Sequence, residues 1–179
     1  MKHESKKITL IGLLAACLCI LAPVSFPIGV IPISLATFAI YIIASLLVWH
    51  NTILVILVYI VIGAVGLPVF SGFRGGFSIL LGYTGGYIFG YILMGLAISL
   101  LLKNNKNKLW MYPIAMLVGT IFCYLFGSIW YMVESNNNLA STLVVAVVPF
   151  ILPDLIKIVV ASYVTYILNT KTSISSTLS

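Results

Sequence analysis

SILLGYTGGYIFGYILMGLAISLLL, residues 78–102, contains no charged side chain, whereas the six residues that follow it, KNNKNK at 103–108, are all polar. A helix needs about 20 consecutive apolar residues to cross the hydrocarbon core of a membrane, and this run is long enough. Lysines at the end of an apolar run are typical of loops that face the cytoplasm. We therefore expect residues 78–102 to form a membrane-spanning helix that ends in a cytoplasmic loop.

Further apolar runs on both sides of this one predict an all-α integral membrane protein. Hydrophobic residues make up 62% of the 179 residues and charged residues 7%, whereas a soluble domain carries about 25% charged residues. We therefore expect a single membrane domain over residues 1–179. The predicted spans, about six transmembrane helices, are roughly 8–26, 33–49, 52–66, 78–102, 109–132 and 143–168.

The distribution of charges predicts the orientation in the membrane. With both termini in the cytoplasm, Arg74 and Glu134 fall on the outer side and seven lysines on the inner side, which follows the positive-inside rule. An odd number of spans would move only Lys171, so the loop at 103–108 fixes the orientation. The net charge of +6 suits contact with anionic lipid headgroups, and we expect no nucleic-acid partner. The inner lysines are Lys2, Lys6, Lys7, Lys103, Lys106, Lys108 and Lys171.

Three segments on the outer side are expected to be loops. Residues 23–32 hold three prolines and predict a rigid, non-helical loop, and residues 133–141 are polar. Residues 66–78 are rich in glycine, and GYTGGY follows at 82–87. Glycines beside aromatic residues and an arginine suit a loop that folds over a ligand, but small residues also let membrane helices pack closely. The residues alone leave both interpretations open, and the candidate ligand contacts are Arg74, Tyr83, Thr84 and Tyr87.

Asp154 and Lys157 are the sharpest candidates for a binding site, because both charges lie inside the last apolar run. A spacing of three places them on one face of a helix, and each charge at the bilayer centre costs about 2.5–3.5 kcal/mol. Pro149 and Pro153 should interrupt the helix, so that Asp154 lies near the start of a re-formed helix that lines a cavity. The alternative is a self-neutralised ion pair that only joins two helices.

The first apolar run carries small residues at helical spacing. Gly12 and Ala16 are four apart, as are Ala15 and Cys19, and this spacing favours contact between membrane helices. An interface for a partner protein, formed by Gly12, Ala15 and Ala16, and an internal packing face explain the pattern equally well. The residues 14–17 also look like a lipoprotein cleavage site, but the apolar run continues to residue 26, so we expect no cleavage.

Catalytic residues, cofactors and metals are not expected. Cys17, Cys19 and Cys123 lie in apolar runs without histidine or carboxylate neighbours, so they suit neither disulfides nor a metal site. His3 and His50 lie outside the predicted spans, so an intramembrane serine or zinc enzyme would lack its partner residue. A single Asp–Lys pair also does not form the charged ring of an ion channel.

Three segments resemble the signature segments of the BioY family, the biotin-binding S components of energy-coupling factor (ECF) transporters. They are GLPVFSG at 66–72, GYTGGY at 82–87 and PFILPDLIK at 149–157, in the order and spacing of the family. The similarity covers nearly the whole chain. It implies an S-component fold of six helices in a bacterial cell membrane, with both termini cytoplasmic.

The resemblance also implies a ligand and partners. Biotin would be captured from outside and delivered with an ECF transmembrane coupling protein and two cytoplasmic ATPase subunits, and the first helix would dock to the coupling protein. A carboxylate such as Asp154 can accept hydrogen bonds from the ureido N–H groups of biotin, and Lys157 or Arg74 can meet its carboxylate. Tyr83 stands where the family usually has proline, and Ala36 where it often has glutamine. An S component for another vitamin is therefore the alternative.

Overall fold

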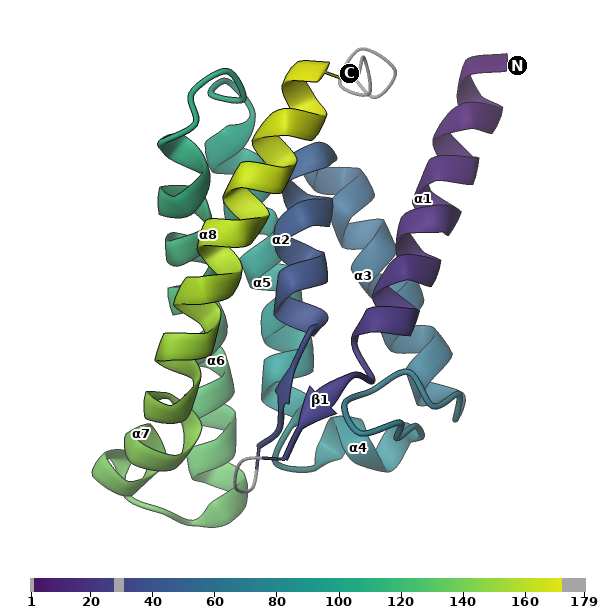
Figure 1. The fold of residues 1–179 in the computed structure, drawn as a ribbon. Helices are drawn as coiled ribbons and strands as arrows, with labels where there is room; N and C mark the ends of the chain where they lie inside the picture. Colours follow the sequence, from purple (N-terminus) through teal and green to yellow (C-terminus); the bar gives the residue numbers. More distant parts are fainter. Residues whose placement is uncertain (1, 28–30, 172–179) are drawn as a thin grey trace.

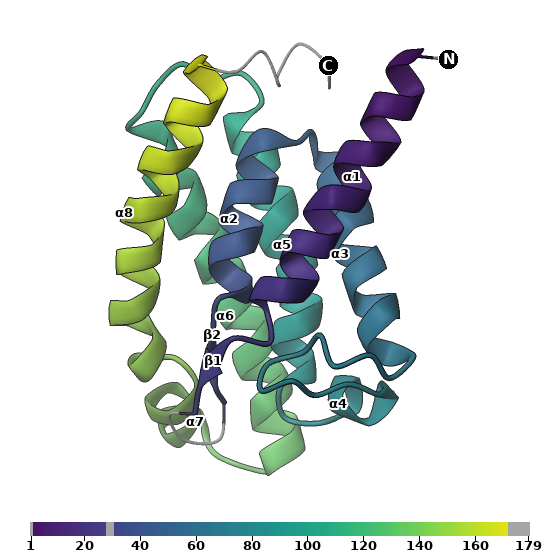
Figure 2. The same ribbon diagram turned by 45° about the vertical axis from the view of Figure 1, so that its right-hand side comes forward.

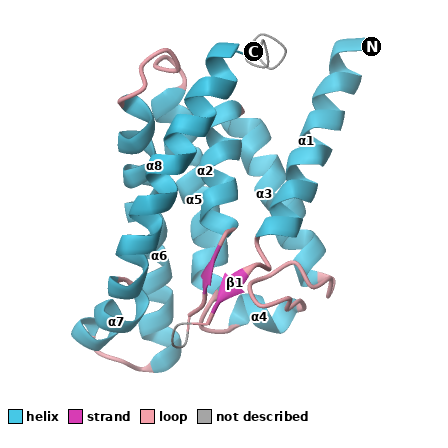
Figure 3. Cartoon of the chain, in the orientation of Figure 1, coloured by secondary structure: helices cyan, strands magenta, loops and turns pink. Residues whose placement is uncertain are grey.

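Helices form most of the molecule, as the long apolar runs predict. The computed structural model describes residues 2–27 and 31–171. In these ranges the longer helices run side by side (Figures 1 and 2), and they are α1 (Lys2–Leu21), α2 (Ala36–Leu46), α3 (Trp49–Ala64), α5 (Gly85–Leu102), α6 (Met111–Ser135) and α8 (Val148–Lys171). Short elements gather at one end (Figure 3), namely α4 (Phe77–Leu81), α7 (Leu139–Ala146) and the strands β1 (Ser25–Phe26) and β2 (Ile33–Ser34). The all-α prediction is confirmed.

The two ends of the helical bundle differ in character. The start of α1, the end of α8 and the loop between α5 and α6 lie at one end, which we call the lysine-rich end, and the short elements lie at the other, the loop end (Figure 1). At the lysine-rich end, Lys106 donates a hydrogen bond of 2.9 Å to the carbonyl of Leu46. This bond caps the last turn of α2, whose carbonyls lack helical partners. Burial lowers the pKa of Lys106.

The helices differ in length, and α2 is much shorter than its predicted span of 33–49. By length and composition, α5, α6 and residues 148–170 of α8 are able to cross a membrane, whereas the apolar helices at 7–21, 36–46 and 49–64 are shorter. The 11 residues of α2 cover only about 16 Å, roughly half the hydrocarbon thickness. Residues 33–34 are extended instead, as strand β2. Irregular backbone is tolerated at membrane depth where it lines a cavity.

The turn between α2 and α3 also differs from the sequence prediction. The polar pair at 50–51 suggests a turn, but the chain turns at Leu47 and Val48, whose ψ values of 161° and 155° are extended. His50 and Asn51 belong to the first turn of α3.

The predicted span 78–102 is broken near the loop end. Residues 82–84 separate α4 from α5. A Cβ atom on Gly85 would lie 1.9 Å from the carbonyl oxygen of Leu80, so the chain can turn back this closely only where glycine stands. Because of this break, residues 78–81 belong to the separate short helix α4 and not to the long helix α5.

The predicted span 143–168 is divided between α7 and α8, but not at the predicted place. The break precedes Pro149, which lies in the first turn of α8, where a missing N–H group does no harm. Pro153 lies inside the helix. Asp154 is therefore in the second turn of α8, and not at a helix N-terminus as the sequence suggested. Its charge must be stabilised by something other than free backbone amides.

Candidate functional site

The proline-rich segment forms a hairpin against the glycine-rich loop. Strands β1 and β2 are antiparallel, with Ser25 opposite Ser34. The amide of Gly72 donates a 3.0 Å hydrogen bond to the carbonyl of Pro23, which ties the glycine-rich loop to the base of the hairpin. The predicted non-helical backbone is confirmed for the described residues of 23–32.

The glycines lie in two kinds of surroundings, a tightly turning loop and a close contact between helices. Gly72 and Gly76 have positive φ values of 75° and 106°, a conformation that favours glycine and lets the loop turn sharply. In contrast, a Cβ atom on Gly86 would lie 2.2 Å from the Cβ of Trp130. This glycine therefore allows α5 to approach α6 closely. The loop glycines thus allow sharp turns, and the helix glycine allows close packing.

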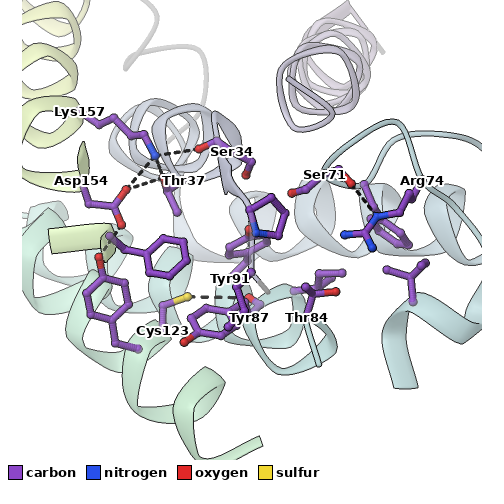
Figure 4. Close-up of a pocket in the computed structure, with 17 residues that line it drawn as sticks. Ser34, Thr37, Ser71, Arg74, Thr84, Tyr87, Tyr91, Cys123, Asp154 and Lys157 are labelled. Atoms are coloured by element: carbon purple, nitrogen blue, oxygen red, sulfur yellow. Dashed lines mark hydrogen bonds and ion pairs between the residues drawn. The ribbon is translucent and has the colours of Figure 1, made fainter. Parts of the chain in front are cut away.

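A cavity lies beneath these loops, among α2, α5, α6 and α8 (Figure 4). The empty space between its lining residues is about 570 Å³, part of which is open solvent. Apolar and aromatic side chains alternate with a few polar groups, as small-molecule sites require. The lining residues are Ile31, Pro32, Ser34, Thr37, Phe70, Ser71, Arg74, Ile79, Thr84, Tyr87, Ile88, Tyr91, Cys123, Tyr124, Phe150, Asp154 and Lys157.

Asp154 and Lys157 form an ion pair in one wall of the cavity (Figure 4). Asp154 Oδ1 lies 2.9 Å from Lys157 Nζ, and the two side chains are 5% and 12% exposed. Oδ1 also accepts a hydrogen bond of 3.1 Å from Thr37, and Oδ2 accepts one of 2.6 Å from the hydroxyl of Tyr124. Side chains of α2, α6 and α8 thus stabilise the carboxylate in place of helix N-terminal amides.

Lys157 and Arg74, the two positively charged residues of the cavity, differ in how many of their N–H groups already make hydrogen bonds. Lys157 donates to the carbonyl of Ser34 at 2.8 Å, to Thr37 at 3.1 Å and to Asp154 at 2.9 Å, which accounts for all three N–H groups of its ammonium. Arg74 is exposed and lies on the opposite side of the cavity in Figure 4. Its Nε donates to the carbonyl of Ser71 at 3.0 Å, and within the described residues its terminal nitrogens make no hydrogen bond.

Most of the candidate contacts come together in this cavity, but Tyr83 does not. Tyr83 is 47% exposed, and its ring centroid lies 5.7 Å from that of Tyr131, away from the lining residues. Neighbouring residues in the break before α5 point in different directions, so Thr84 lines the cavity while Tyr83 does not. The candidates that line it are Arg74, Thr84, Tyr87, Asp154 and Lys157.

Several lining residues were not predicted from the sequence. Thr37 and Tyr124 bond directly to Asp154, and Tyr91 lines the cavity nearby. The two tyrosines carry a usable signal, because tyrosine in membrane helices usually lies at the interface and these lie mid-helix. Thr37 carries none, since its contact with Asp154 joins residues 117 positions apart.

The small residues of α1 do not share one face. Gly12 and Ala16 are exposed, and no atom lies within 4 Å of a Cβ built on Gly12. Ala15 is 3% exposed and belongs to the core, against which Cys19 packs. Adjacent helix positions are about 100° apart, which explains the separation. Of the three residues predicted for a partner interface, Gly12 and Ala16 thus lie on the surface of α1, whereas Ala15 is occupied by internal packing.

Comparison with known proteins agrees with the motifs. The BioY family model matches residues 1–173. The chain is 34% identical over 153 residues to the biotin transporter BioY of Thermotoga maritima, covering 86% of this chain and 89% of that one. It is 32% identical over 155 residues to the biotin transporter BioY2 of Lactococcus lactis subsp. cremoris, covering 87% and 85%.

A solved structure extends this similarity to the fold. The crystal structure of the S-component for biotin from an ECF-type ABC transporter matches with a TM-score of 0.91 and 26% sequence identity, covering 99% of this chain and 98% of that one. The resemblance seen in three short segments therefore holds over the whole length. The chain belongs to the BioY family.

Proposed function

We propose that this chain is the substrate-binding S component of an ECF uptake system and that it captures biotin in the cavity beside Asp154 and Lys157. The ion pair is the observation that carries this proposal, because it lines a largely apolar cavity in a membrane protein. Ionisable groups at membrane depth are costly, and they usually mark substrate or ion sites. The names of the relatives support biotin as the ligand. Membership of a transporter family speaks against an enzyme.

The donor and acceptor chemistry favours one orientation of biotin. The ureido ring offers two N–H donors and a carbonyl acceptor, and the tail ends in a carboxylate. Asp154 can accept a ureido N–H, whereas the ammonium of Lys157 has already used its donors. The terminal nitrogens of Arg74 are available for a bidentate bond to a carboxylate. In this orientation the ureido ring lies at the ion pair and the tail reaches toward Arg74.

Arg74→Gln is expected to weaken biotin binding about tenfold or more, because a hydrogen bond to a charged group is worth about 1.5–3 kcal/mol. The affinity for biotin methyl ester, which lacks the carboxylate, should hardly change. Isothermal titration of the purified protein in detergent measures both affinities. Equal losses for the acid and the ester would show that Arg74 does not meet the carboxylate.

Equilibrium binding in the absence of ATP tests the ligand itself. The purified chain should bind biotin saturably and should not bind riboflavin, thiamine or lipoate. Tight binding of another vitamin with no response to biotin would favour the alternative, an S component for that vitamin.

The proposal includes six membrane crossings, with the lysine-rich end and both termini in the cytoplasm and the loop end outside. The lysines at 103–108 support this orientation through the positive-inside rule. The start of α1 and the end of α8 lie at the same end of the bundle as these lysines (Figure 1). Biotin would then enter from the loop end. A transmembrane coupling protein and two cytoplasmic ATPases would drive its release inward.

Replacing Gly12 and Ala16 with leucine is expected to reduce assembly with the coupling protein while biotin binding persists, because both positions are exposed on α1. Co-purification from membranes that contain all subunits measures assembly. Ala15→Leu is the contrasting variant, since Ala15 lies in the core and overpacking there costs about 1–3 kcal/mol of stability. Normal assembly of the double variant would exclude this face of α1 as the interface.

A further inference from the structure

Tyr124 lies between the cavity and the outer surface of the helices. It lines the cavity, and it also lines two apolar grooves. One groove, with an empty volume of about 580 Å³, is formed by α6, α7 and Val147. The other, of about 400 Å³, lies between α6 and α8 and is lined by Asp154 as well. Two residues, Tyr124 and Asp154, are thus shared between the binding cavity and the outer grooves.

The outer grooves present hydrocarbon surfaces. Ile121, Leu125 and Leu155 line them and are 48%, 56% and 43% exposed. In a membrane protein, exposed aliphatic side chains of this kind face the acyl chains of lipids. Tyr124 and Asp154 therefore lie between the cavity and these lipid-facing grooves.

One hydrogen bond joins α6 to α8 at the level of the cavity, from the Tyr124 hydroxyl to Asp154 Oδ2 at 2.6 Å. The other side-chain hydrogen bonds between these helices, among the described residues, connect Ser162 to Met116 and Asn169 to Tyr112. Both lie further along α8, toward the lysine-rich end. At the level of the cavity, side-chain hydrogen bonding between α6 and α8 in the described residues thus depends on Tyr124.

We infer that Tyr124 is the lateral seal of the binding cavity and a positioning residue for Asp154. Its ring closes the gap between α6 and α8 against lipid, and its hydroxyl orients the carboxylate. A seal is needed because acyl chains entering the cavity would remove the polar surroundings of the ion pair, at high cost. The positioning role rests on the proposed function, whereas the sealing role does not.

Cys123 provides a direct test of the seal. It lines the cavity and is only 2% exposed. In a Cys17→Ser/Cys19→Ser background reconstituted in vesicles, Cys123 is labelled either with pyrene maleimide, which enters from lipid, or with the charged sulfonatoethyl methanethiosulfonate, which enters from water. Tyr124→Ala should raise the rate at which pyrene maleimide labels Cys123 about tenfold or more, because the helices open more easily there. The rate of labelling by the charged reagent should not change.

Two variants make this test specific. Phe122→Ala removes a lipid-exposed ring from the same helix and should leave pyrene labelling unchanged. Tyr124→Phe keeps the ring, so labelling should stay close to the unmodified level, while biotin affinity falls about tenfold with the loss of the hydrogen bond to a charged group.

The outcomes separate the roles of Tyr124. Faster labelling of Tyr124→Ala by both reagents would indicate general loosening and overturn the seal, as would unchanged labelling by pyrene maleimide. Unchanged biotin affinity in Tyr124→Phe would overturn the positioning role. If pyrene labelling rises in Tyr124→Ala but the unmodified protein does not bind biotin, the seal holds and the proposed function fails.

Discussion

Asp154→Asn is expected to weaken biotin binding at least about tenfold, since a hydrogen bond from a ligand to a charged group contributes about 1.5–3 kcal/mol. Asparagine preserves the shape of the side chain and can still accept from Lys157 and Thr37, while its amide can donate to the oxygen of Tyr124, the present donor to Oδ2. The change removes the charge and the acceptor that we assign to the ureido ring. Titration of the purified variant with biotin measures the loss.

The matched control is Glu134→Gln, which also removes one carboxylate but at an exposed position. It should bind biotin normally. A thermal unfolding curve of Asp154→Asn in detergent shows whether the variant is folded. If the folded variant binds biotin as tightly as the unmodified protein, Asp154 is structural and the assignment of the site is wrong.

Lys157→Gln is expected to lower the free energy of unfolding by about 3–5 kcal/mol, the usual effect of leaving one partner of a buried ion pair alone. Lys157 makes three hydrogen bonds, of which two join α8 to α2 and to β2 and the third goes to Asp154 in the same helix. Among the described residues no other cation forms an ion pair with Asp154. Reversible unfolding in mixed micelles measures the change, and an unchanged unfolding free energy would contradict it.

The double variant Asp154→Asn/Lys157→Gln separates the structural role of the pair from its role in binding. It removes both charges, so its stability should recover relative to Lys157→Gln, because no uncompensated charge remains. Its biotin affinity should stay as low as that of Asp154→Asn. Recovery of both stability and affinity would mean that the pair acts only as a bridge between helices.

Much of the fold followed from the sequence where composition decides it. The runs that became α5 and α6 are long, apolar and bounded by polar residues, so their existence and type were predictable. The shortness of α2 was not, because it adjoins the hairpin at its start and the bond from Lys106, 60 positions away, at its end. Contacts between distant segments leave no local pattern.

The same distinction applies to the candidate site. Asp154 and Lys157 were visible because charges are rare in apolar runs. Thr37, which bonds to both, was not visible, since a threonine in a membrane helix costs little and is common there. Tyr83 and Thr84 show that the sequence also could not predict which of two neighbouring side chains lines the cavity. Both lie in the segment at 82–87 that resembles the family, but only the backbone of the break before α5 decides which of them faces the cavity.

The ligand's place and orientation can be measured directly by a structure of the chain with bound biotin. We expect the ureido ring within hydrogen-bonding distance of Asp154, the carboxylate on Arg74, and the ring of Tyr124 closed against the ligand between α6 and α8. Biotin bound outside this cavity, or bound with its carboxylate at the ion pair and its ureido ring at Arg74, would contradict the assignment.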